Sequence, residues 1–329
     1  MDTTCTAAPP GSSPPSRPGA PRPGRVPLRA AAAGLPVSFI LIWSSGYLVG
    51  DIGTNSLPPF TLLWWRFAVA GLAALVVALI GRARWPRRPR QWLHLMIIGI
   101  LLHTVQFGGV YVGMSIGAPA GLSALLVGTS PLVIALVGTF AFNERMSRVQ
   151  WVGLLLGVVG VAAAVQSQLG GGVPTLAILA VLVGLAGMIA GTLYQKHYGP
   201  PVDVRCGLTI QMFAALVTTT TATAVNGGFE PPSGTEEITT VLWLAIVCSL
   251  GGFGLLFALL RRRSGGAATS YLFLVPPVTA LIAVPLLSEP VSTGMLVGIA
   301  VAACGVTLVT RQPTPTKNAI RHVRNSRRH

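Results

Sequence analysis

Apolar segments of about 20 residues alternate with short polar links along most of the chain. A helix of this length crosses the hydrocarbon core of a bilayer, because each residue adds about 1.5 Å along the axis. The pattern predicts an all-α membrane protein with ten transmembrane helices. We expect them near residues 30–50, 59–80, 92–114, 119–142, 148–166, 174–194, 206–225, 240–260, 267–288 and 291–310.

The composition supports lipid as the solvent for most of the surface. Charged residues make up 9% of the chain and hydrophobic residues 52%, whereas a soluble domain has about 25% charged residues. The net charge of +15 does not indicate a nucleic-acid partner, because the basic residues form short clusters between apolar runs without interleaved aromatics. The four cysteines show no C-x-x-C spacing, so we expect no metal site.

The basic residues also predict an orientation. If the N-terminus is cytosolic, every Lys and Arg except Arg66 falls on the cytosolic side of the ten helices. The outer links then carry only acidic charges, at Asp51, Glu230, Glu236, Glu237 and Glu289. The positive-inside rule therefore predicts a multi-pass protein of the inner (plasma) membrane with both termini in the cytoplasm.

One stretch of sequence occurs twice. In "AFNERMSRVQWVG" and "LLSEPVSTGMLVG", Glu144 matches Glu289, and the same offset of 145 positions continues across the chain. It also pairs Pro131 with Pro276, and an ungapped register of this length indicates duplication of a five-helix unit. Because five is odd, the second copy enters the membrane inverted, which is typical of alternating-access carriers.

These boundaries divide the chain into four parts. We expect a disordered Pro/Arg-rich cytosolic tail at 1–28, a first five-helix repeat at 29–166, a second at 174–310 and a basic cytosolic tail at 311–329. The basic tail either fixes the topology or contacts anionic lipid headgroups.

Several segments together carry a family resemblance over about residues 35–310. They are "IWSSGYLVG", "LPPFTLLWWRFAVAG", "GLSALLVGTSPLVIALVGTFAFNERMSRVQWVGLLLGVVGV" and "SYLFLVPPVTALIAVPLLSEPVSTGMLVGIAVAACGV". In this order they resemble the EamA-type family of the drug/metabolite transporter superfamily. The resemblance implies a secondary carrier of a small molecule, often an exporter of amino acids, metabolites or toxic organic compounds. It does not identify the cargo.

Arg66 is the most informative candidate for the substrate site. An arginine at the centre of a membrane helix costs about 3 kcal/mol, so it should face the bundle interior or a wet cavity. Its guanidinium suits bidentate binding of a substrate carboxylate. Alternatively it snorkels to the headgroups while stacking on Trp64, Trp65 or Phe67. The second repeat has Gln211 at the matching position, so a role for the charge is not duplicated.

His103 and Gln106 lie one turn apart on the third helix, and His103 is the only histidine in the interior of a predicted span. If transport is coupled to protons, His103 is the candidate carrier, because an imidazole titrates near neutral pH. The alternative is a hydrogen-bonded packing residue.

Aromatic residues and prolines complete the candidate substrate-binding set. Trp43 and Tyr47 share a face of the first helix at spacing i, i+4, and with Tyr271 on the ninth they suit an amphipathic or cationic cargo or else pack the core. Pro131 and Pro276 interrupt the fourth and ninth helices, and the breaks either line the substrate path or are simple kinks.

Glu144 and Glu289 precede the fifth and tenth helices. A negative charge at a helix N-terminus is favourable by about 0.3–1 kcal/mol, so they either stabilise these ends or act as coupling or gating carboxylates. Ser147 and Gln150 fit a capping box for the fifth helix. Glycines on the fifth and tenth helices predict a close-packed seam or a homodimer face: Gly153, Gly157, Gly160, Gly298 and Gly305.

Other function classes remain as alternatives. A lipid or lipid-precursor flippase of the same fold would open sideways to lipid, and a channel would show flux without saturation. An intramembrane serine protease would use Ser130 and His103. The nucleotide loop G-x-x-x-x-G-K-[ST] is absent, so we expect no ATP drive, no cofactor and no enzymatic activity.

Overall fold

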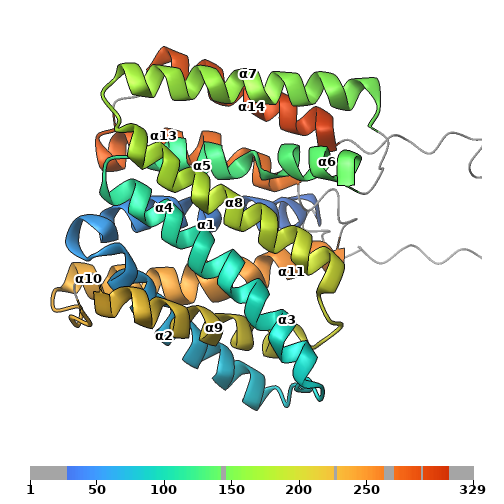
Figure 1. Cartoon of the computed structure of the whole chain (residues 1–329), viewed down its shortest axis with the longest axis vertical. Coiled ribbons are helices and arrows are strands. Elements are labelled where there is room, and N and C mark those ends of the chain that lie inside the picture. The colour runs from blue at the N-terminus through green and yellow to red at the C-terminus, as the bar shows by residue number, and fades with distance from the viewer. Residues whose placement is uncertain (1–27, 142–145, 226–227, 263–269, 290–291, 311–329) are drawn as a thin grey trace, which may run out of the picture.

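The computed structural model describes residues 28–141, 146–225, 228–262, 270–289 and 292–310, and all its regular elements are helices (Figure 1). The first repeat contains α1 (Leu28–Ser56), α2 (Pro59–Ile80), α3 (Pro89–Gly99), η1 (Ile100–Val105), α4 (Gln106–Ser115), α5 (Ala120–Gly128), α6 (Ser130–Ala141) and α7 (Arg148–Gly170). The second contains α8 (Thr175–Tyr198), α9 (Val204–Val225), α10 (Thr235–Leu242), η2 (Trp243–Gly251), α11 (Gly252–Arg262), η3 (Ser270–Leu274), α13 (Val275–Leu287) and α14 (Thr293–Thr310).

Each of the ten predicted segments contains helix. Within the described residues nine helices are long and apolar enough to cross a membrane, and Val275–Leu287 is a shorter apolar helix at the ninth position. The ends differ from the prediction by several residues. Asp51 lies on α1 rather than in a link, because Gly53 and Thr54 pack against the rest of the bundle and extend the helix to Ser56. The predicted tails lie outside the described residues, apart from residue 28.

The contact between α7 and α14 demonstrates the inversion directly. These two helices are equivalent in the repeat, and they pack side by side in the layer at the top of Figure 1. A Cβ at Gly153 would lie 2.7 Å from the carbonyl oxygen of Gly305, and a Cβ at Gly298 would lie 2.6 Å from that of Gly160. Because Gly153 matches Gly298 and Gly160 matches Gly305, one contact is made twice in antiparallel helices. The five-helix repeats are therefore related by a pseudo-twofold axis.

The N-terminal caps of α7 and α14 are also repeated. The Gln150 amide donates to Ser147 Oγ at 3.3 Å, and the Ser147 amide donates back to Gln150 Oε1 at 2.8 Å, which confirms the predicted capping box. At the second copy the Met295 amide donates to Ser292 Oγ at 3.1 Å. The outer face of α7 exposes Leu155, and a homodimer through this face stays a prediction.

Two kinds of interruption in the helices occur at equivalent positions in both repeats. The third helix of each repeat contains a π-helical segment, η1 in one and η2 in the other, and η1 shifted by 145 residues falls inside η2. The fourth helix breaks at Thr129 (φ −83°, ψ −3°) and its equivalent breaks at Leu274 (φ −86°, ψ −11°). Pro131 and Pro276 follow these breaks by two residues, so the predicted interruptions are present.

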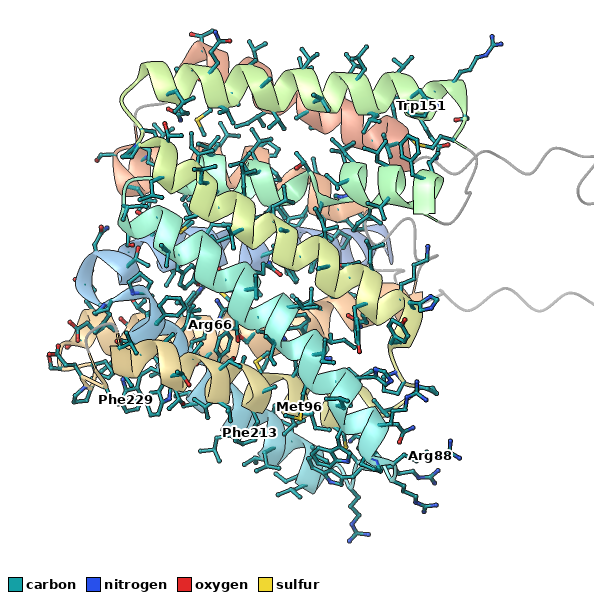
Figure 2. All side chains as sticks on the ribbon, viewed as in Figure 1. Arg66, Arg88, Met96, Trp151, Phe213 and Phe229 are labelled. Carbon is teal, nitrogen blue, oxygen red and sulfur yellow. The ribbon has the colours of Figure 1, made fainter. Side chains whose placement is uncertain are left out.

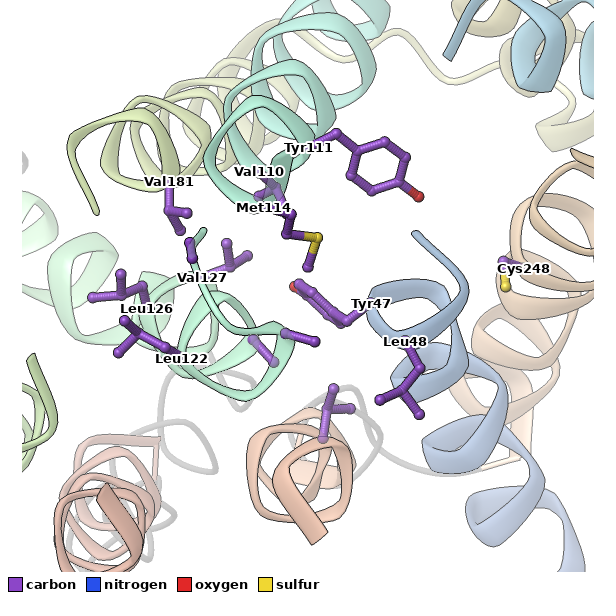
Figure 3. Close-up of a cluster of buried hydrophobic side chains, with 14 of the residues drawn as sticks. Tyr47, Leu48, Val110, Tyr111, Met114, Leu122, Leu126, Val127, Val181 and Cys248 are labelled. Carbon is purple, nitrogen blue, oxygen red and sulfur yellow. The ribbon is translucent and has the colours of Figure 1, made fainter. Parts of the chain in front are cut away.

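The largest buried apolar cluster is shared between the repeats. Figure 3 shows Tyr47 of α1 and Met114 of α4 pointing toward one another, with Leu126 of α5 and Val181 of α8 nearby. Cys248 of η2 belongs to the same cluster. The core therefore holds both repeats together around the site described next.

Candidate functional site

A cavity of about 380 Å³ lies among α1, α3, α8, α9 and α11, which is within the usual size range of ligand pockets. One end of the cavity is lined by the α8–α9 link, at Gly199, Pro200 and Val202. The other end adjoins a smaller cavity of about 30 Å³, because the two share four lining residues: Trp43, Gln106, Phe107 and Phe253. Arg66 lines the smaller cavity.

Arg66 is held by two hydrogen bonds and an aromatic ring. Its side chain lies inside the bundle (Figure 2) and is 3% exposed, so it does not snorkel to the headgroups. Nε donates to Ser249 Oγ at 3.1 Å, and Nη1 donates to Tyr111 Oη at 2.8 Å. The guanidinium carbon lies 4.1 Å from the ring centroid of Phe107, a cation–π distance. Among the described residues no carboxylate lies within ion-pair distance of Arg66.

Tyr111 reaches Arg66 because α1 has glycine where the ring passes. A Cβ at Gly50 would lie 2.8 Å from the Tyr111 ring. The Tyr111 hydroxyl also donates to the carbonyl oxygen of Gly46, at 3.4 Å. The pair Gly46 and Gly50, at spacing i, i+4, is the sequence signal that would have pointed to a bulky partner on another helix.

His103 of η1 lines neither cavity, but it contacts Gln211, which lines the larger one. It is 1% exposed, and Nε2 lies 3.4 Å from Gln211 Oε1 while Nδ1 is buried without a partner. Gln211 is the repeat equivalent of Arg66. Each of these two residues thus bonds to the π-helical segment of the opposite repeat, Arg66 to η2 and Gln211 to η1. The His103 ring also stacks on Phe107, with centroids 6.3 Å apart, and Phe107 is the ring that lies against Arg66.

The structure brings only some predicted site residues to the cavity. Trp43 and Gln106 line both cavities, Tyr47 lines the smaller one, and Gln106 is 5% exposed. Tyr271 packs beside Phe39 and Leu259 rather than lining the cavity. The cavity also takes walls from α9, the seventh predicted helix, which the sequence had not suggested.

Pro131 and Pro276 likewise lie away from the two main cavities. Pro276 packs on Gly128, where a Cβ would meet the proline ring at 2.8 Å. Ser130 makes no hydrogen bond to His103 within the described residues, so the pair required by a protease is not formed.

Glu289 has a structural partner that the sequence did not predict. Its Oε1 accepts a hydrogen bond from the Ala120 amide at 2.6 Å, so it caps α5 of the first repeat rather than α14, whose N-cap is Ser292. Pro119 precedes α5 and has no side-chain capping group, and Glu289 supplies that function. Burial raises the pKa of the Glu289 carboxyl, and the backbone bonds from Ala120 and Gly121 partly offset this. Glu144 lies outside the described residues.

The end of the bundle near α5's N-terminus is closed by further bonds. Thr61 Oγ1 donates to the Gly228 carbonyl at 3.0 Å, and Trp65 Nε1 donates to the Glu230 carbonyl at 3.0 Å. These two contacts tie α2 to the α9–α10 link, and the Glu289 cap ties α5 to the α13–α14 link, all on the side away from the α8–α9 link. The helices therefore form a membrane bundle with a central polar site approached from one end.

Comparison with known proteins identifies the class of this bundle. Residues 32–166 and 174–311 each match the EamA-like transporter family. An uncharacterised inner membrane transporter of Escherichia coli (strain K12), YedA, is 31% identical over 277 residues, which cover 83% of this chain and 88% of that protein. A probable amino-acid metabolite efflux pump of Salmonella typhimurium (strain LT2) is 24% identical over 285 residues, covering 83% and 92%.

A solved crystal structure has a similar fold, with a TM-score of 0.58 and 19% sequence identity, covering 89% of this chain and 99% of that chain. Such a bundle, with a repeat matched twice, is that of a multi-pass inner membrane transporter for a small molecule. The chain belongs to the EamA-like transporter family.

Proposed function

We propose that the chain is a secondary transporter that exports small amphipathic metabolites, amino acids or drugs bearing a carboxylate. It would work by alternating access, with the two inverted repeats rocking around a central site. The chemistry of Arg66 and the shape of the cavity support this proposal.

The unpaired charge of Arg66 is the observation that carries the proposal. Burying a cation is costly unless an anion or several hydrogen bonds compensate. Arg66 has two neutral hydrogen-bond partners and a ring, and its Nη2 has no partner within the described residues. A carboxylate in the smaller cavity would supply the missing anion and accept two bonds from the guanidinium.

The wider cavity suits the remainder of such a cargo. Trp43, Phe107 and Phe253 offer aromatic surface beside Arg66, and Thr192 and Gln195 offer polar groups farther out. An apolar body with a carboxylate at one end and polar groups at the other therefore matches this lining.

The proposed direction follows from the basic links. Arg205, at the start of α9, donates to the Gly81 carbonyl at 3.0 Å, which places the arginine-rich α2–α3 link at the same end as the α8–α9 link. The positive-inside rule makes this end cytosolic, with both termini. The cavity would then accept cargo from the cytosol, as an exporter requires.

Coupling and gating would use the other candidates. His103 is the proposed proton carrier, because its ring stacks on Phe107 of the cavity lining and its Nδ1 has no partner. Glu289 is a proposed outer gate, because its bond to Ala120 joins α5 to the α13–α14 link. Glu144, at the equivalent position, is the proposed counterpart.

Exchange in liposomes tests the proposed cargo class. Arg66→Gln should weaken exchange of an aromatic amino acid or aryl carboxylate by roughly 10- to 100-fold, the value of a charged hydrogen-bonded pair. The matching amide, which lacks the carboxylate, should lose much less. Arg148→Gln is the control, because it removes one exposed arginine that lines neither cavity. Equal losses for acid and amide would contradict the proposal.

The same vesicles test the proton carrier. His103→Gln should keep exchange and lose accumulation driven by a pH gradient, since glutamine preserves polarity but cannot titrate. Undiminished pumping by this variant would remove His103 from the coupling step.

A further inference from the structure

A further cavity, of about 290 Å³, lies on the opposite face of the wall formed by α3 and α9 from the 380 Å³ cavity, which we call the cargo cavity. Met96 of α3 and Phe213 of α9 line it, and both are partly exposed on the outside of the bundle (Figure 2). Leu95 and Gln211, next to them along the same helices, line the cargo cavity. We call this outer cavity the α3–α9 groove; its full lining is Leu75, Trp85, Trp92, Met96, Thr209, Ile210, Phe213, Ala214 and Val217.

The groove presents almost only carbon to its occupant. Thr209 is its one hydroxyl residue, and that hydroxyl donates to the Arg205 carbonyl at 2.8 Å. The indole of Trp92 donates to the Pro86 carbonyl at 3.0 Å, so its nitrogen is satisfied too. A polar ligand would find no free partner among these two groups, whereas an alkyl chain needs none.

Stacked tryptophans shape one wall of the groove. The rings of Trp85 and Trp92 lie parallel, with centroids 5.8 Å apart and an interplanar angle of 10°. Trp85 belongs to the α2–α3 link and Trp92 to α3, so the stack fixes the link against the helix. The groove is therefore formed without its occupant.

The link beside the groove is strongly basic. It carries four arginines, and a fifth lies in the first turn of α3; all five are exposed, and no acidic residue occurs between Gly81 and Gln91. Figure 2 shows Arg88 at this edge of the molecule, beyond Met96 and Phe213. The arginines are Arg82, Arg84, Arg87, Arg88 and Arg90. An apolar groove bordered by a basic link matches a molecule with an alkyl chain and an anionic head.

We propose that the α3–α9 groove binds one acyl chain of an anionic phospholipid whose headgroup contacts the arginines of the α2–α3 link. Anionic headgroups attract basic segments at the cytosolic membrane surface, and the acyl chain would extend from there along the groove. Because the groove is the reverse side of the cargo cavity wall, the bound lipid would support the α3–α9 wall from outside.

Tryptophan quenching by brominated lipids tests the site on the full-length protein in vesicles. The signal from Trp85 and Trp92 is the difference between the wild type and a Trp85→Phe/Trp92→Phe variant. Brominated phosphatidylglycerol in a phosphatidylcholine bilayer should quench this signal about threefold more than the same fraction of brominated phosphatidylcholine.

Arginine variants test whether the α2–α3 link itself binds the headgroup or whether the net positive charge of the protein attracts anionic lipid in general. Arg84→Gln/Arg87→Gln/Arg88→Gln should remove the preference for phosphatidylglycerol. The control, Arg321→Gln/Arg324→Gln/Arg327→Gln, removes the same charge elsewhere and should keep it. Equal quenching by both lipids, or a preference that survives in the first variant, would overturn the proposal. No quenching by either lipid, with a cross-linked dimer, would assign the groove to a second copy of the chain.

Discussion

The two repeats meet both at the α7–α14 seam and around Arg66. Equivalent positions make the same contacts at the seam, but they differ around Arg66. At the seam, equivalent glycines make equivalent contacts, so Gly153 and Gly298 have the same role. Around the cavity, equivalent positions hold different chemistry. Arg66 bonds to Ser249, whereas Gln211 bonds to His103.

The difference extends to the residues that surround each position. The offset of 145 pairs Phe107 with Gly252 and Tyr111 with Leu256, so the second repeat lacks both the ring and the hydroxyl that hold Arg66. Symmetry is therefore kept where backbones pack and lost where a ligand would be bound. A duplicated fold can move as two matching halves while only one half carries the charge.

The largest effects are expected at the seam, where the two halves should be equally sensitive. A Cβ at Gly160 would overlap the backbone of Gly298 and Ala302, and one at Gly305 would overlap Gly153 and Gly157. Gly160→Val and Gly305→Val should each destabilise the fold by on the order of 3 kcal/mol and sharply lower the yield of folded protein. Size-exclusion profiles and melting temperatures in detergent measure this.

A helical glycine with open space around it provides the control for the seam. Gly254→Val adds the same side chain where nothing lies within 4 Å, so it should leave the melting temperature nearly unchanged. A loss of stability for only one of the Gly160 and Gly305 variants would show that the two halves of the seam are not equally sensitive.

Moving the arginine from position 66 to the equivalent position 211 of the second repeat should not restore binding of carboxylate cargo. The double variant Arg66→Gln/Gln211→Arg keeps the net charge, but its arginine would face His103 and lack partners equivalent to Phe107 and Tyr111. Exchange of carboxylate cargo should stay about 10- to 100-fold below wild type, as for Arg66→Gln alone. Recovery of exchange would mean that a positive charge anywhere in the cavity suffices.

A smaller effect on cargo binding is expected at Ser249, the hydrogen-bond partner of Arg66 on the third helix of the second repeat, and none is expected at the equivalent residue of the first repeat. Ser249→Ala removes the bond to Arg66 Nε and should weaken carboxylate cargo about fivefold, or about 1 kcal/mol. Thr104 is its repeat equivalent and bonds to Thr218 at 2.6 Å instead. Thr104→Val should therefore leave cargo affinity unchanged, and equal effects of the two substitutions would show that the asymmetry is not functional.

The smallest expected effect is a change in the pH dependence of stability at Glu289. Since burial raises its folded-state pKa, the folded protein holds this proton more tightly than the unfolded chain. The resulting stabilisation is complete below the unfolded pKa and is lost as pH rises through the folded pKa. Glu289→Gln should remove this component, because glutamine can still accept from Ala120 but does not titrate. Melting temperatures measured between pH 4 and 8 would show a flatter profile, and an unchanged profile would contradict the assignment.

The sequence predicted those features that depend on local pattern or on the repeat. Apolar segment lengths located the helices, Ser147 and Gln150 gave the cap of α7, and the charge of Arg66 in an apolar span pointed to the bundle interior. The ring of Phe107 beneath Arg66 and the cap that Glu289 gives to Ala120 could not be predicted, because each joins residues whose distance in space depends on the packed fold.

The π-helical segments were also not predicted, since nothing in the residues of η1, His103 included, distinguishes a π turn from an α turn. The same limit applies to the cavity walls. Gln211 reaches His103 because α9 crosses the third helix closely where α3 ends at a glycine: a Cβ at Gly99 would lie 2.6 Å from the Gln211 backbone.

The π-helical segment η1 has a consequence for where such a chain can tolerate the loss of a codon. A π turn holds about one residue more than an α turn, and each residue turns an α-helix by about 100°. Deleting one residue between Ile100 and Val105 would let this turn close as an α turn, with Phe107 and Tyr111 still directed at Arg66 and Leu95 in place. The same deletion within α4, ahead of Tyr111, would rotate that side chain by about 100°. A lost codon would thus be absorbed in η1, whereas one turn later it would remove a hydrogen-bond partner of Arg66.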